Sequence, residues 1–202
     1  MSGPKHFYNA LPAFIVGAIE GLIVILAIFC FLLARGVDAG LIYIYTGIAV
    51  VFIAGLLAVG AYYTRKEEME NSGGESKILK IYQSLDIDDH LKKAMVDDTL
   101  QENKVWEKEW QEGSNATSSL MPKQYALSVF LGFFSGGIII LLNNYLMELP
   151  NYAALLIPFL LLGILGYYKY KLSHQKPLNG MLLISLSGMA AAIGAWYAGG
   201  FF

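Results

Sequence analysis

Charge is scarce in this chain: 15% of its 202 residues are Asp, Glu, Lys or Arg, while 56% are hydrophobic. That balance is too apolar for an ordinary soluble domain. The 14 basic and 16 acidic residues leave a formal net charge of -2, so there is no bulk positive field that would attract nucleic acid. The single cysteine, Cys30, excludes a disulfide framework, a zinc ribbon and a C-x-x-C redox motif.

Catalytic motifs are also missing. The sequence contains no H-E-x-x-H or E-x-x-H metal motif and no glycine-rich phosphate loop. Its three histidines, His6, His90 and His174, lie outside the apolar runs, so no serine or cysteine nucleophile has a plausible base beside it. We therefore do not expect an enzyme.

Long apolar runs make up most of the chain. Five are long enough to cross roughly 30 Å of hydrocarbon at about 1.5 Å per helical residue. They predict an all-α membrane protein with five transmembrane helices and a cytoplasmic helical insert between the second and third. The predicted spans are Pro12–Ala34, Gly40–Tyr63, Gln124–Met147, Asn151–Tyr168 and Leu178–Phe202.

The charges gather between the second and third runs, which divides the chain into residues 1–64, an acidic insert at 65–122, and residues 123–202. The insert holds 13 of the 16 acidic and 8 of the 14 basic residues. Basic residues near span ends stay in the cytosol. With the N-terminus and the insert inside, Arg35 is the one basic residue outside, against thirteen inside. The orientation leaves open whether the membrane is a bacterial cytoplasmic membrane or a vacuole-type membrane.

Glu20 is the one charged residue within the five runs. An ionisable side chain at that depth is costly and normally faces a bundle interior, a partner or a water-filled path. It is either a cation ligand or proton carrier, or a protonated glutamic acid hydrogen-bonded across the bundle. Because no other Asp, Glu, Lys, Arg or His lies in a span, we expect no intramolecular ion pair within the membrane, and a second subunit is the available source of a neighbouring carboxylate.

Small residues at four-residue spacing mark expected helix contact faces in two runs, at Gly17 and Gly21 and at Gly132 and Gly136. Asn143 and Asn144, near the end of the third run, either cap the helix at the interface or supply amide oxygens to a cation.

Two spans, an acidic insert and three further spans, with Gly17-Ala18-Ile19-Glu20-Gly21 in the first span, resemble the vacuolar iron transporter family. Ala54-Gly55-Leu56-Leu57-Ala58, the pair Asp97-Asp98 and Gly136-Gly137-Ile138 are similar to further motifs of that family. The resemblance implies a homodimer in the lipid bilayer that moves Fe2+ or Mn2+ out of the cytosol in exchange for protons, with no permanently bound cofactor. The sequence departs from the family's pattern where Val59 replaces a methionine and Tyr63 a glutamate.

The candidate metal-binding residues are carboxylates, one within the first span and the others at the start of the insert. A solvated helix face is the alternative explanation for the insert acids, which would leave a non-transporting, membrane-anchored interaction or metal-sensing protein whose insert binds a partner through Trp106 and Trp110. The candidates are Glu20, Glu67, Glu68, Glu70 and Glu75.

Overall fold

The computed structural model describes residues 4–71, 120–146 and 155–201. Within these ranges every element of regular structure is a helix. The helices are α1 (Pro4–Ala34), α2 (Ala39–Asn71), α5 (Pro122–Leu146), α6 (Leu156–Leu172) and α7 (Pro177–Phe201). The body of the predicted cytoplasmic insert lies outside the described residues.

Four of these helices contain a segment long and apolar enough to cross a membrane: Ala10–Ala34, Ala39–Glu70, Pro122–Leu146 and Pro177–Phe201. The prediction of an all-helical membrane protein is thereby confirmed for the described ranges. The remaining helix, α6, has 17 described residues, which is at the lower end of the range for a membrane-spanning helix. The predicted span at Asn151–Tyr168 begins outside the described residues, and the helix continues past Tyr168 to Leu172.

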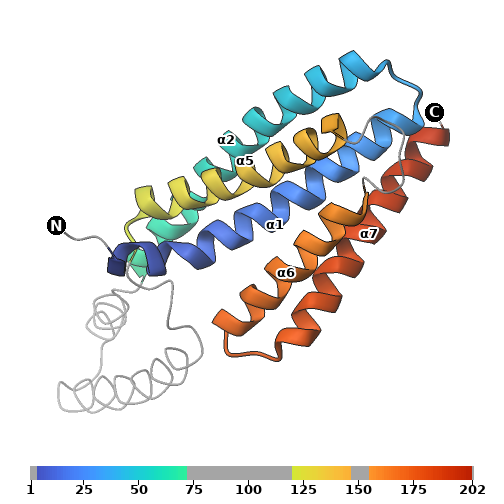
Figure 1. The fold of residues 1–202 in the computed structure, drawn as a ribbon. Helices are drawn as coiled ribbons and strands as arrows, with labels where there is room; N and C mark the ends of the chain where they lie inside the picture. The colour runs from blue at the N-terminus through green and yellow to red at the C-terminus, as the bar shows by residue number, and fades with distance from the viewer. Residues whose placement is uncertain (1–3, 72–119, 147–154, 202) are drawn as a thin grey trace, which may run out of the picture.

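The first helix is the centre of the bundle. It contacts each of the other four described helices, and in Figure 1 it runs between α5 on one side and α6 and α7 on the other. In the most apolar stretch of 18 residues of α1, 56% of residues are buried, against 22% in the corresponding stretches of α2 and α7. Leu22, Ile25 and Leu26 are fully buried, and they form the middle of the hydrophobic core.

Glycines allow α1 and α5 to touch backbone to backbone. A Cβ atom on Gly17 or Gly21 would collide with the carbonyl oxygens of Val129 and Phe133. A Cβ on Gly136 would lie 2.5 Å from the carbonyl oxygen of Ala18, and Gly132 meets the backbone of Phe14 in the same way. The two predicted small-residue faces therefore pack against each other within one chain, as small residues do in membrane helix pairs.

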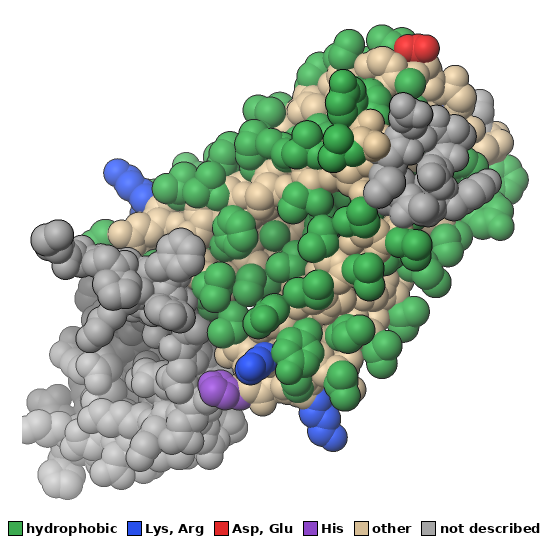
Figure 2. Space-filling model, in the orientation of Figure 1, with side chains coloured by type: hydrophobic (Ala, Val, Ile, Leu, Met, Phe, Trp, Pro, Cys, Tyr) green, Lys and Arg blue, Asp and Glu red, His purple; other side chains and the backbone are tan. Residues whose placement is uncertain are grey.

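The bundle has two chemically different ends. The start of α1, the end of α2 and the α6–α7 turn lie at one end in Figure 1, and the α1–α2 turn lies at the other. Figure 2 shows hydrophobic side chains over the visible face, with Lys and Arg confined to its margins. Of the basic residues that the structure describes with their side chains, Arg35 lies at the α1–α2 turn. The others lie at the opposite end: Arg65, Lys66, Lys123, Lys169, Lys171 and Lys176.

Replacing Gly21 with alanine tests the close α1–α5 contact. We expect Gly21→Ala to lower the free energy of unfolding by about 1–3 kcal/mol, because the added methyl group forces the two backbones apart. Gly55→Ala is the control, since nothing lies within 4 Å of a Cβ at that position on α2. Thermal unfolding of the purified protein in detergent measures both. Equal stability of the two variants would contradict the packing described here.

Candidate functional site

Glu20 lies on the least covered stripe of α1. It is ten residues into the apolar segment Ala10–Ala34, which places it about 15 Å along the helix from the start of that segment. Successive residues are rotated by about 100° around the axis, so the contact of Gly21 with α5 turns the neighbouring Glu20 away from that contact. Val16 and Ala27 lie near the same stripe, and all three are only partly buried.

A carboxylate in this position has little local support. Within the described ranges, Glu20 takes part in no ion pair closer than 4.0 Å and no side-chain hydrogen bond. The oxygens of an ionised carboxylate are acceptors that a cation, a proton or water can occupy. The Glu20 carboxylate is therefore available to a cation, a proton or water.

A basic residue lies on a helix that packs against α1. Lys169 belongs to the last turn of α6, and α6 contacts α1. The expectation that Glu20 has no ion pair within one chain stays a prediction. Lys169 is not a candidate for that role in the sequence, because the predicted span ends at Tyr168, whereas the helix continues through Leu172.

Polar groups meet where the end of α2 approaches the start of α5. Tyr125 lies in the first turn of α5 and is partly buried. Arg65 pairs with Glu68 at 2.8 Å, and its Nε donates a hydrogen bond to the carbonyl oxygen of Leu120 at 3.3 Å. Arg65 therefore joins the end of α2 to the stretch just before α5. From the sequence, Tyr125 is interpreted only as an interfacial anchor.

The other predicted metal-binding acids are not gathered around Glu20. Glu67, Glu68 and Glu70 are exposed on the last two turns of α2, and Lys66 lies 3.7 Å from Glu70. Glu75 lies outside the described residues. In the part of the chain that the structure describes, no three His, Cys, Asp or Glu side chains come together as a potential metal site.

Three buried polar side chains lie toward the end of the bundle that contains the α1–α2 turn. Asn143 and Asn144 are buried in the last turns of α5, and Asn144 donates a hydrogen bond to the carbonyl oxygen of Ile140 at 2.9 Å. Thr46 of α2 is fully buried, and its hydroxyl has no hydrogen-bond partner among the described residues. Sequence reasoning missed Thr46, because its burial depends on how α2 packs.

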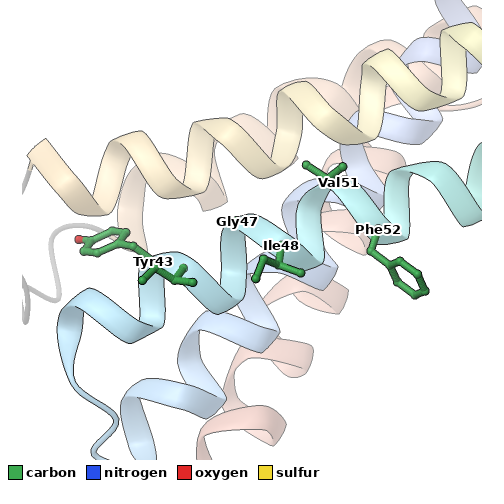
Figure 3. Close-up of a pocket in the computed structure, with 6 residues that line it drawn as sticks. Tyr43, Gly47, Ile48, Val51 and Phe52 are labelled. Atoms are coloured by element: carbon green, nitrogen blue, oxygen red, sulfur yellow. The ribbon is translucent and has the colours of Figure 1, made fainter.

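A shallow groove of about 600 Å³ runs along α2 and does not include Glu20. Figure 3 shows its lining on the side of α2, where Ile48 and Phe52 point away from the helix beside Gly47. The lining is almost wholly apolar, so it offers no set of oxygen ligands for a hard cation. It fits contact with hydrocarbon rather than with an ion.

These observations define a helical membrane protein with a single carboxylate at depth in its central helix, an arrangement typical of proteins that move ions across membranes. The sequence pattern of the VIT family matches residues 61–200. The chain belongs to the VIT family, and that membership implies transport of metal ions across a membrane. The match begins in α2, so α1 with Glu20 lies outside it. The search of curated proteins returned no match.

Arg65 is expected to fasten the end of α2 to the start of α5. Arg65→Ala removes a charged hydrogen-bond donor whose side chain is 11% exposed, and we expect it to lower the free energy of unfolding by about 1–2 kcal/mol. Lys66→Ala is the control, because the more exposed Lys66–Glu70 pair is worth about 0–1 kcal/mol. Thermal unfolding in detergent compares them. A Lys66 variant that loses as much stability as the Arg65 variant would rule out this anchoring role.

Proposed function

We propose that this protein moves a divalent metal cation, Fe2+ or Mn2+, out of the cytosol in exchange for protons. The observation that carries the proposal is Glu20, which lies at depth on the least covered stripe of the central helix. A carboxylate that faces a partner or a water-filled path can bind either a cation or a proton. A pH difference across the membrane then drives exchange at one group.

The distribution of basic residues supports the proposed orientation of the protein in the membrane. They concentrate at the end of the bundle that contains the end of α2 and the α6–α7 turn. Such residues favour the cytoplasmic side. We therefore propose that Glu67, Glu68 and Glu70 face the cytosol and raise the local cation concentration at the entrance.

A second copy of the chain would complete the metal site. A hard divalent cation takes several oxygen ligands, yet the described part of one chain gathers no group of three His, Cys, Asp or Glu side chains that could hold such an ion. Pairing two chains along the stripe of Val16, Glu20 and Ala27 would bring two carboxylates together and balance the charge of one divalent ion. We propose a homodimer of this geometry.

The ligand chemistry favours Mn2+ over a softer ion. Val59 occupies the position at which the resemblance to vacuolar iron transporters places a methionine, so a thioether ligand is missing there. Carboxylate, carbonyl and water oxygens suit Mn2+ well.

The central test is Glu20→Gln. This substitution keeps the size of the side chain but removes its negative charge, and we expect Mn2+ uptake into proteoliposomes under a pH gradient to fall at least about tenfold. Glu67→Gln, on the exposed end of α2, is the control and should keep most of the uptake at saturating Mn2+. Gel filtration checks that both variants stay folded and assembled. Unchanged uptake by folded Glu20→Gln would refute the mechanism.

Cysteine cross-linking tests the proposed dimer. In a Cys30→Ser background the chain has no other cysteine, so Ala27→Cys should form a disulfide-linked dimer in the membrane on mild oxidation, as measured on non-reducing gels. Leu56→Cys, exposed on α2, is the matched position away from the stripe and should stay monomeric. Cross-linking at Leu56 in place of Ala27 would move the interface to α2.

A further inference from the structure

Glu20 of α1 and Lys169 of α6 belong to two helices that contact each other. A Cβ on Gly188 of α7 would contact Leu162 of α6 and would lie 3.6 Å from Ile23 of α1. These three residues therefore fix where α1, α6 and α7 meet. Leu162 is fully buried there.

The positions of Glu20 on α1 and Lys169 on α6 follow from this meeting point. Glu20 is three residues before Ile23 on α1, and Lys169 is seven residues after Leu162 on α6; spacings of three and seven keep each charge near the same helix face as the residue at the contact. The helices run in opposite directions in Figure 1, so both steps lead toward the same end of the bundle. A lysine side chain can extend its ammonium group along such a surface.

We propose that Lys169 is the counter-charge of Glu20 and competes with the transported cation for the carboxylate, which sets how readily the site releases its ion. This inference rests on the proposed function of Glu20. When a cation arrives, it replaces the ammonium group as the positive partner of the carboxylate. When the cation leaves, Lys169 keeps an ionised Glu20 from remaining in the membrane without a positive charge nearby, which would be costly.

The neighbouring basic residues separate this role from simple anchoring. Lys171, one residue beyond Tyr170, is exposed, whereas Lys169 is partly buried. Tyr170 packs against Gly180 of α7, which fixes the rotation of this last turn of α6. Lys169 and Lys171 therefore differ in burial, a difference that holding the helix end in the cytosol does not require.

The test compares Lys169→Gln with Lys171→Gln in proteoliposomes, using Mn2+ as the probe. Loss of the competing charge should lower the KM for Mn2+ roughly 3- to 10-fold, as expected for one unit charge in a partly solvated setting. It should also lower kcat, because the ion is released more slowly. Lys169→Arg should restore both values, and Lys171→Gln should keep them at the wild-type level.

The outcomes distinguish this inference from the function on which it rests. A Lys169→Gln variant with wild-type KM and kcat, or one whose kcat falls with no decrease in KM, would overturn the role of Lys169 and leave the transport role of Glu20 untouched. Equal effects of Lys169→Gln and Lys171→Gln would also overturn it. Normal uptake by Glu20→Gln would refute the proposed function itself. Thermal unfolding in detergent confirms that each variant is folded.

Discussion

The direct contact between the backbones of α1 and α5 sets the rest of the arrangement. Lipid tails are as apolar as leucine, so helices in a membrane associate through close packing. Here glycines on both helices remove the side chains that would otherwise separate them. Because Gly17 and Gly21 fix the rotation of α1, they also fix the direction of Glu20, which is one residue away from Gly21. The packing motif and the charged residue look independent in the sequence. In the structure, the contact made by the packing motif also determines the direction in which Glu20 points.

Hydropathy predicted most of the bundle but not the ends of its helices. It places the second span at Gly40–Tyr63, while α2 continues to Asn71, and it ends the fourth at Tyr168, while α6 continues to Leu172. The reason is physical: hydropathy reports where lipid contact stops, whereas a helix ends where its backbone hydrogen bonds stop. Those polar extensions carry Arg65, Glu68 and Lys169, the groups that act on or near the candidate site.

The candidate site was predictable in its centre and not in its surroundings. A single carboxylate among 114 apolar-span residues identifies Glu20 from the sequence alone. Its neighbours depend on how the helices rotate and cross, which no local pattern encodes. In the sequence, Lys169 contributes only to the count of basic residues that predicts the orientation in the membrane. Tyr125 is interpreted there only as an anchor at the membrane interface. The small-residue faces were correctly placed, but their spacing alone did not reveal that each has the other as its partner.

The hydrogen bond from Arg65 to Leu120 joins residues 55 positions apart, and it does so at the point where the chain leaves one membrane helix and enters another. The two ends of the stretch between Arg65 and Leu120 are thus held together by the bundle itself. The entropic cost of bringing the ends of a chain segment together grows only slowly with its length. The packing of the membrane helices, rather than the number of residues between Arg65 and Leu120, therefore decides that these two residues meet.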